Sequence, residues 1–273
     1  MKEIVDVKEV QKIALGVLVY IDKVCRENKI RYSLAGGTLL GAIRHKGFIP
    51  WDDDIDIFMP RDDYNKFLEI MDNDAKTNDK YRALHCCKMY PNYFYAFCKV
   101  VDLSTHLVEA TYKTNKDMGI FVDIFPIDGI DINKSDKIIK KSLFYKRMLS
   151  HSIMKKIYFV KNTKFLKRIG KYLIYPIAKL FGYKYWWKKH EKLTTNYDFN
   201  KYEYVIPYSG SYGKKDICLR TFFDEFIELP FENHKFLAIK NYDKYLTQLY
   251  GDYMTPPPPE KQITHHDFKI YKK

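Results

Sequence analysis

The stretch that decides the fold runs from Leu34 to Tyr64 and reads LAGGTLLGAIRHKGFIPWDDDIDIFMPRDDY. Four aspartates stand within five positions near its middle, and the last two, Asp54 and Asp56, alternate with apolar residues as far as Met59. This alternation predicts a strand that carries both acids on one face and the isoleucines on the other. Nothing in strand formation favours aspartate, so a nearby cation must compensate the two carboxylates.

The two acids are candidate ligands of a divalent cation. Carboxylates at positions i and i+2 of a strand can both reach one Mg²⁺, which prefers hard oxygen ligands. Asp123 repeats the device, because it is a single acid within the apolar segment FVDIF at 121–125. An unpaired buried charge is costly, so Asp123 is either a third metal ligand or the partner of a core lysine or arginine. A solvated acidic turn is the alternative for the run at 52–56.

Gly36 and Gly37 are candidate phosphate-binding residues. They follow a strand predicted for Ile30–Leu34 and precede a short helix that Thr38 would cap and that would end near His45. Glycines at such a turn let backbone N–H groups approach a phosphate at the positive end of the helix. A Gly-Gly pair alone is common in turns. The prediction therefore depends on the order of strand, glycines, helix, Asp-x-Asp strand and single-aspartate strand.

The remaining elements complete an α/β pattern. Apolar residues recur at three and four positions after the predicted N-cap Asp6, which indicates an amphipathic helix that ends near Asn28. Further strands are expected at about 81–86, 93–101, 105–110 and 119–125, the last stopped by Pro126, and a helix at about 243–250. We predict a nucleotidyltransferase-like mixed β-sheet core with flanking helices at 1–133, a basic helical insertion at 134–198, and a C-terminal segment at 199–273 that completes the site.

The composition favours a folded protein with anionic partners. The 273 residues are 46% hydrophobic, which excludes a disordered chain, and they carry a formal net charge of +13. The five cysteines form no Cys-x-x-Cys pair and are expected to be reduced thiols. The first residues lack an apolar signal segment, and no run of about 18 apolar residues occurs. We therefore expect a cytoplasmic protein.

Positive charge is concentrated in the expected insertion. Between residues 155 and 192, twelve lysines and arginines stand against a single acid, Glu191, and aromatic residues lie between them. A solvated helical face is one interpretation. A peripheral contact with the inner face of the cell membrane is another, because each lysine near an anionic leaflet contributes about 1 kcal/mol. No nucleic-acid reading motif accompanies the charge, so we predict no nucleic-acid partner.

Three stretches resemble the LicD family of phosphocholine transferases: Leu34–Tyr64, FVDIFPIDG at Phe121–Gly129 and YDKYLTQLYGDYMTPP at Tyr242–Pro257. The resemblance implies the nucleotidyltransferase fold and transfer of phosphocholine from CDP-choline to a sugar hydroxyl, with release of CMP. The acceptor would be a bacterial surface glycan, such as a lipopolysaccharide or teichoic acid, or its lipid-linked precursor. Fukutin-like enzymes share the core motif, so transfer of a phosphoalditol such as ribitol phosphate from a CDP-alditol is an alternative.

The resemblance also implies roles for individual residues. The Gly-Gly-Thr segment at 36–38 would hold the donor phosphates. Asp54 and Asp56 would bind two Mg²⁺ ions, with Mn²⁺ as an alternative metal. Asp123 would bind the ion that activates the acceptor hydroxyl, and could also accept its proton. In such a site the ions lower the pKa of the hydroxyl and stabilise the leaving phosphate during an in-line displacement.

Three further residues are candidates for contact with the donor. Arg44 lies in the first stretch and would neutralise phosphate, although a solvated basic turn fits its position equally well. Lys99 would reach the diphosphate or would pair with a structural acid. Trp51 would stack on cytosine or ribose, or would pack beside Pro50. Choline would need aromatic faces around its cation, and the 24 tyrosines permit such a cage without locating it.

Two other functions are compatible with parts of the sequence. A nucleotidyltransferase proper would use the same acids, attack the phosphorus that bears the nucleoside, and release pyrophosphate. A basic membrane- or nucleic-acid-binding module would keep the acids only for a structural Ca²⁺. The glycine turn together with three strand acids argues against such a module, because simple binding does not need that arrangement.

Overall fold

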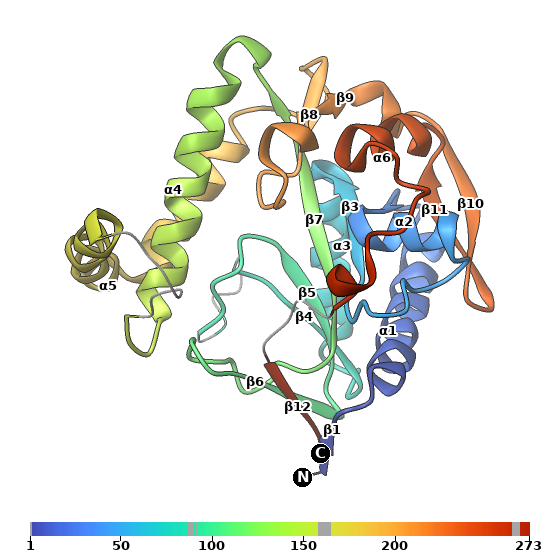
Figure 1. Ribbon diagram of the computed structural model, residues 1–273, viewed down its shortest axis with the longest axis horizontal. Coiled ribbons are helices and arrows are strands. Elements are labelled where there is room, and N and C mark those ends of the chain that lie inside the picture. Colours follow the sequence, from blue (N-terminus) through green and yellow to red (C-terminus); the bar gives the residue numbers. More distant parts are fainter. Residues whose placement is uncertain (1, 87–89, 91, 158–164, 264–267) are drawn as a thin grey trace.

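A computed structural model describes the chain except for residues 1, 87–89, 91, 158–164 and 264–267 (Figure 1). The fold is α/β, as predicted. The Asp6 carboxylate caps the first helix by accepting the N–H of Lys8 at 2.9 Å. The α-helices in the described part of the chain are α1 Val7–Glu27, α2 Gly36–Arg44, α3 Arg61–Asp74, α4 Ser135–Ile153, α5 Phe165–Thr194 and α6 Tyr242–Tyr250.

The central sheet is mixed, and α1 and α3 pack against it. Its main path runs through β2 Ser33–Leu34, β3 Asp56–Pro60, β7 Phe121–Ile130, β5 Cys98–Asp102 and β4 Tyr81–Leu84. The far end of β7 also pairs with β8 Tyr204–Ile206, which pairs with β9 Cys218–Leu219. A second sheet contains β1 Lys2–Ile4, β12 Phe268–Lys272 and β6 Thr105–Glu109, and a hairpin contains β10 Phe226–Phe231 and β11 His234–Ile239.

The parallel pair β3 and β7 brings the predicted acids together. The register pairs Asp56 with Asp123, and the antiparallel neighbour β5 pairs Lys99 with the same aspartate. Ile57 and Ile124 follow these acids and are completely buried, because successive side chains point to opposite faces of a sheet. The alternation in both strands therefore correctly predicts which side chains enter the core.

The prediction that Pro126 stops its strand is wrong, because β7 continues to Ile130. The segment of β7 that pairs with β5 ends at Ile124, and the segment that pairs with β8 begins at Asp128. Pro126 falls in the gap between these two ladders. A proline is tolerated there because no ladder bond on that edge requires its missing N–H.

Two predicted boundaries next to the site are also wrong. β3 begins at Asp56, so Asp54 lies in the loop that leads into the strand. The neighbour β2 is only two residues long and does not extend the pairing further back. Thr38 lies inside the first turn of α2, whose N-cap is Ala35. The Thr38 hydroxyl accepts the N–H of Asp56 at 2.8 Å and so joins α2 to the start of β3.

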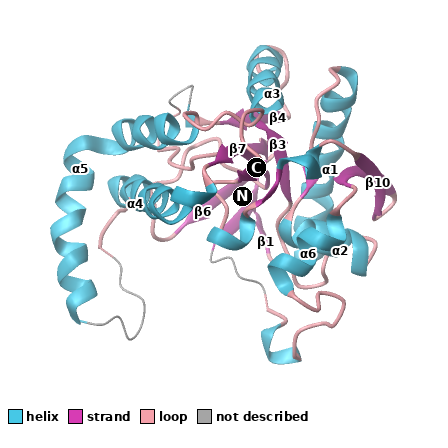
Figure 2. Cartoon of the chain, turned by 90° about the horizontal axis from the view of Figure 1, so that it is seen from above, coloured by secondary structure: helices cyan, strands magenta, loops and turns pink. Residues whose placement is uncertain are grey.

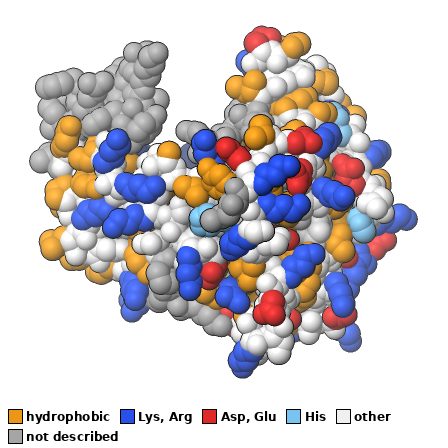
Figure 3. Space-filling view, turned by 90° about the horizontal axis from the view of Figure 1, so that it is seen from below, with side chains coloured by type: hydrophobic (Ala, Val, Ile, Leu, Met, Phe, Trp, Pro, Cys, Tyr) orange, Lys and Arg blue, Asp and Glu red, His pale blue; other side chains and the backbone are white. Residues whose placement is uncertain are grey.

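Helices α4 and α5 pack against each other, and α5 lies at the edge of the molecule (Figures 1 and 2). Met148, Leu149, Ala178 and Trp186 form the small core between them. On the face seen in Figure 3, hydrophobic and basic side chains are mixed on this lobe. The region is helical as predicted, although Lys161 and Lys164 of the basic run lie outside the described residues. The division of the chain into three parts stays a prediction.

Cys25, Cys86, Cys98 and Cys218 are buried thiols, in agreement with the expectation of reduced cysteines, and Cys87 lies outside the described residues. In the described part of the chain, no helix has both the length and the apolar character needed to cross a bilayer.

Candidate active site

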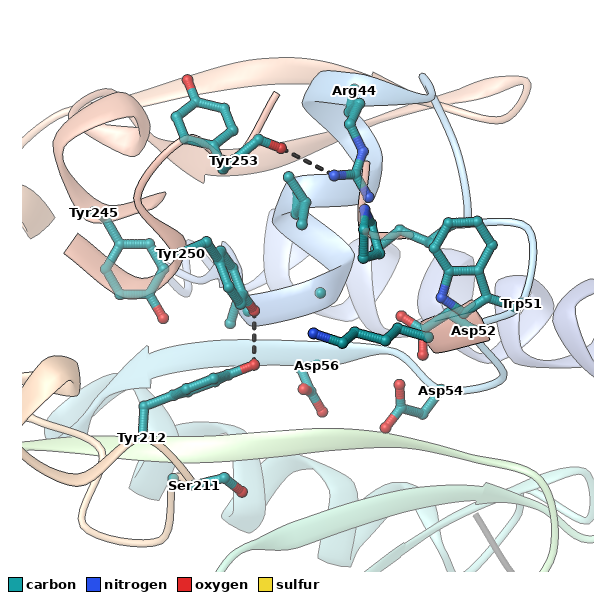
Figure 4. Close-up of a pocket in the computed structure, with 18 of the residues that line it drawn as sticks. Arg44, Trp51, Asp52, Asp54, Asp56, Ser211, Tyr212, Tyr245, Tyr250 and Tyr253 are labelled. Carbon is teal, nitrogen blue, oxygen red and sulfur yellow. Dashed lines mark hydrogen bonds between the residues drawn. The ribbon is translucent and has the colours of Figure 1, made fainter. Parts of the chain in front are cut away.

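A cavity of about 800 Å³ lies beside the predicted acids (Figure 4). Its walls come from segments far apart in the sequence: α2, the loop before β3, the strands β3 and β7, the loop at 210–212, α6, and the segment that follows α6. Of the predicted site residues, the cavity is lined by Gly36, Gly37, Arg44, Trp51, Asp54 and Asp56, whereas Thr38, Lys99 and Asp123 are not among the lining residues.

The two glycines allow α2 to start against the acids. Gly36 has a φ of +48°, and a Cβ added there would lie 3.5 Å from Oδ2 of Asp56. A Cβ on Gly37 would come within 2.9 Å of Oδ2 of Asp52, closer than real Cβ contacts. A side chain at position 37 would therefore displace the Asp52 carboxylate, and one at position 36 would be strained by the positive φ. The space in front of the helix N-terminus is suited to an anionic group such as a phosphate.

Asp54 and Asp56 lie next to each other in the cavity (Figure 4). Burial raises the pKa of Asp56 well above its ordinary value, and the negative charges of Asp54 and Asp123 add to the increase. Such a carboxylate needs a nearby positive charge to stay ionised at neutral pH. The side chains offer hard oxygen donors, which fit Mg²⁺ or Mn²⁺.

Asp123 is paired with Lys99. The Lys99 Nζ lies 2.6 Å from Oδ1 of Asp123, and both side chains are buried. The same ammonium group lies 3.4 Å from the ring centroid of Phe121 and 4.5 Å from that of Tyr95. The sequence left two possibilities for each of these residues, and the observed ion pair corresponds to the one in which Asp123 pairs with a core cation and Lys99 with an acid. A metal role for Asp123 would require the ion and Lys99 to share its carboxylate, and no cluster of three or more His, Cys, Asp or Glu side chains suited to a metal occurs among the described residues.

Arg44 and Trp51 lie on the part of the cavity formed by α2 and the loop after it (Figure 4). The Arg44 Nη1 donates to the carbonyl oxygen of Tyr253 at 2.9 Å, which connects α2 to the segment after α6. Burial lowers the pKa of Arg44 from its ordinary value. The Trp51 ring meets His45 edge-on with centroids 6.4 Å apart. Both residues line the cavity and are placed to contact a ligand.

Sequence reasoning missed the opposite wall, which contains Ser211, Tyr212 and Tyr250. The two tyrosine hydroxyls lie 2.8 Å apart, and their rings are nearly perpendicular with centroids separated by 5.5 Å. Tyr250 belongs to the stretch Tyr242–Pro257, so the family resemblance could have indicated it. Tyr212 has no such signal, because it is one of 24 tyrosines and lies far along the chain from Asp56.

The loop that carries Tyr212 is fixed by a half-buried lysine of α4. Lys146 donates to the carbonyl oxygens of Ser209 and Gly210 at 2.8 and 2.9 Å, and burial lowers its pKa to about 8. The Asp216 Oδ2 accepts the N–H of Tyr212 at 2.9 Å, and a Cβ on Gly210 would approach this oxygen to 2.8 Å. The wall is therefore preorganised by Lys146 from outside the cavity and by Asp216 at its border.

The order of strand, Gly-Gly helix start and an Asp-x-Asp pair at the entry to the next strand, followed by a parallel strand with a third aspartate, defines a protein of the nucleotidyltransferase-fold class. Comparison with known families agrees: the family described as LicD/FKTN/FKRP, nucleotidyltransferase domain, matches residues 29–176. The chain belongs to the LicD family.

Sequence similarity to individual proteins extends beyond the residues that match the family. The lipopolysaccharide cholinephosphotransferase LicD of Haemophilus influenzae is 32% identical over 270 residues, which cover 97% of each chain. An uncharacterised protein of Rickettsia typhi is 39% identical over 102 residues, 37% of this chain and 30% of that protein. An uncharacterised protein of Rickettsia prowazekii is 40% identical over 65 residues, 23% of this chain and 24% of that protein.

Proposed function

We propose that this protein transfers phosphocholine from CDP-choline to a sugar hydroxyl of a lipopolysaccharide-type glycan and releases CMP. The proposal is supported by similarity to a lipopolysaccharide cholinephosphotransferase over 97% of both chains. The structural observation that carries it is the cavity in which the glycine start of α2 faces Asp54 and Asp56. An anion site beside an acidic pair is the arrangement that phosphoryl-group transfer requires.

In this proposal, the donor diphosphate lies over the start of α2. Gly36 and Gly37 leave room for its oxygens, and the N-terminal N–H groups of the helix favour their negative charge. Arg44 and Lys261 line the cavity and supply further positive charge. Trp51 offers a ring face for the cytosine or the ribose.

Asp54 and Asp56 would hold two Mg²⁺ ions, with Mn²⁺ as the alternative metal, and Asp123 would contribute to one of these ions. Bound there, the metal would lower the pKa of the acceptor hydroxyl and neutralise the leaving phosphate. Asp123 would accept the proton of that hydroxyl, while Lys99, at 2.6 Å from Oδ1, fixes the orientation of its carboxylate. The loop at 210–212 lines the same cavity and would help to exclude water from the reacting phosphorus.

The proposed acceptor is a bacterial surface glycan or its lipid-linked precursor, and the proposed location is the cytoplasm, at the inner face of the cell membrane. The basic charge of α5 supports a peripheral contact with that face.

Nucleotide products give the direct test. The enzyme is incubated with Mg²⁺ and a glycan acceptor, and either CDP-choline or CTP is added in parallel reactions. Acceptor-dependent CMP from CDP-choline is the expected product, since the acceptor oxygen attacks the phosphorus that bears choline. Pyrophosphate from CTP, with CDP-choline left intact, would overturn the proposal in favour of a nucleotidyltransferase proper.

A phosphoalditol transferase is the second candidate, because the matching family model also includes the fukutin-type proteins. A third reaction with CDP-ribitol separates the two functions. CMP release from CDP-ribitol at a rate well above that from CDP-choline would replace phosphocholine by ribitol phosphate and leave the site assignment unchanged.

A further inference from the structure

A phenylalanine lies two residues after the aspartate on each of the strands β3 and β7. Phe58 follows Asp56 by two positions on β3, and Phe125 follows Asp123 by two positions on β7. The parallel register pairs the acids with each other and the phenylalanines with each other. Side chains two positions apart point to the same face, so the aromatic pair shares its face with the acids.

This aromatic pair borders the cavity. Phe58 and Phe125 both line it, and their rings meet edge-to-face with centroids 6.2 Å apart. Tyr212, which lines the same cavity from the loop at 210–212, is part of the opposite wall. The Asp216 carboxylate also borders this space, and it accepts the backbone N–H of Tyr212 at 2.9 Å.

The ligand group that this corner suits is a cation without N–H donors. Ring faces attract such a cation through their negative quadrupole, and a nearby carboxylate adds to the attraction without requiring a hydrogen bond. Two strand positions span about 6.6–6.8 Å. The phosphate and the trimethylammonium group of phosphocholine are separated by only two methylene groups, a comparable length. A phosphate held at the acids would therefore place the cation at the aromatic pair.

We propose that Phe58, Phe125 and Tyr212 form the subsite for the trimethylammonium group of the donor. This inference rests on the proposed function and adds where choline is recognised. The same corner disfavours an alditol, because the hydroxyl groups of an alditol would lose hydrogen bonds to water against the phenylalanine rings.

The test compares CDP-choline with its neutral isostere, CDP-3,3-dimethylbutanol, in which carbon replaces the quaternary nitrogen. Binding of both is measured by calorimetry with Mg²⁺. The wild type should prefer the charged ligand by about tenfold, the size expected when two or three ring faces contact a cation. Phe125→Leu and Tyr212→Leu should each lower this ratio to about threefold or less, whereas Tyr212→Phe keeps the ring and should keep the ratio. Phe58 is left intact because it is almost completely buried.

Trp51→Leu is the matched control, since it removes another cavity aromatic on the α2 side. It should weaken both ligands together and leave their ratio unchanged. Unchanged ratios in both Leu variants, with wild-type melting temperatures, would overturn the subsite. If the wild type still releases acceptor-dependent CMP from CDP-choline, only the subsite fails. If it neither binds nor uses CDP-choline, the proposed function and the subsite fail together.

Discussion

The cavity region and the α4–α5 region differ in how their sequences relate to their structures. Around the cavity, Gly36, Gly37, Asp54 and Asp56 lie within one stretch, and the strand register adds Asp123 at a defined position. In α4 and α5, by contrast, basic residues are spread over the helices, and their charge predicts only a surface property. Spacing is informative where the backbone must approach a ligand closely. Composition, in contrast, predicts only the overall charge of a surface such as that of α4 and α5.

The two regions are nevertheless connected. Arg61, at the start of α3, forms a buried two-bond ion pair with Asp128 of β7 at 2.7 and 2.6 Å. Its Nη1 also lies 2.9 Å from Oε1 of Glu191, the single acid of α5. On the other side, Lys146 of α4 holds the loop at 208–210. The helices therefore support the cavity from behind, and the following predictions measure how strongly.

The largest expected effect distinguishes the neighbouring acids Asp53, Asp54 and Asp56, which lie at the entry to β3. Asp56→Asn and Asp54→Asn should each lower turnover by at least about a hundredfold, as loss of a group that stabilises transition-state charge usually does. Asp53→Asn is the matched control, because Asp53 does not line the cavity, and it should change turnover by less than about threefold. Steady-state rates with Mg²⁺ and circular dichroism melts check both statements. A slow but folded Asp53→Asn protein would show that the acidic run acts as a whole.

The second effect concerns Asp216, which belongs to the loop between the two regions. Burial raises its pKa to about 6, above the ordinary value of 3.8. The folded state therefore binds this proton more tightly than the unfolded state, so stability from this group falls as pH rises from about 4 to 6. Between about pH 4 and 6, the wild type should lose up to about 3 kcal/mol in free energy of unfolding relative to Asp216→Asn, which has no carboxyl group to ionise. Urea titrations at several pH values measure the shift, and parallel curves for the two proteins would contradict it.

The parts of the site that could be predicted share a physical origin. Asp56, Asp123 and the glycines are residue types that a strand or helix rarely tolerates without a reason, so their positions are visible in the sequence. The predicted roles of Thr38 and Pro126 are wrong because both depend on neighbouring segments. The Thr38 hydroxyl accepts the N–H of Asp56, and Pro126 falls in a gap between two ladders. Tyr212 could not be found because only tertiary packing brings it to the cavity.

Lys146 also positions the cavity wall, and nothing in the sequence distinguishes it from the other lysines. Lys146→Met should reduce turnover by about tenfold, because the carbonyl groups of Ser209 and Gly210 lose their charged donor and the wall loosens. Lys146→Arg should recover part of the loss. Lys140→Met, on an exposed position of the same helix, should behave as the wild type. Equal rates for the two Met variants would show that the helical region does not position the cavity wall.

The smallest expected effect concerns the outer surface of α5, which the comparison so far describes by charge alone. Leu180 is 81% exposed and Phe181 is 49% exposed, and Lys184, which follows the kink at Gly182, is also exposed. Apolar side chains next to lysines suit the boundary of an anionic leaflet, where the chains insert between headgroups and the ammonium groups meet phosphate. Each lysine in such a place contributes about 1 kcal/mol, so Lys184→Gln should weaken binding to anionic vesicles by about fivefold. Lys240→Gln is the control, because Lys240 lies 2.7 Å from Glu225 on the β10–β11 hairpin, and it should have no effect.

Co-sedimentation at increasing salt measures this binding, which should weaken as screening grows. Leu180→Ser should also weaken it at high salt, where the apolar contribution remains after the charges are screened. The response to Leu180→Ser distinguishes a membrane-binding surface from a solvated basic face. Vesicle binding by a solvated basic face would be weakened by Lys184→Gln and by salt, but not by Leu180→Ser. Equal sedimentation with neutral and anionic vesicles would remove the membrane interpretation altogether. The role of α5 would then be restricted to the support that Glu191 gives to Arg61 behind the cavity.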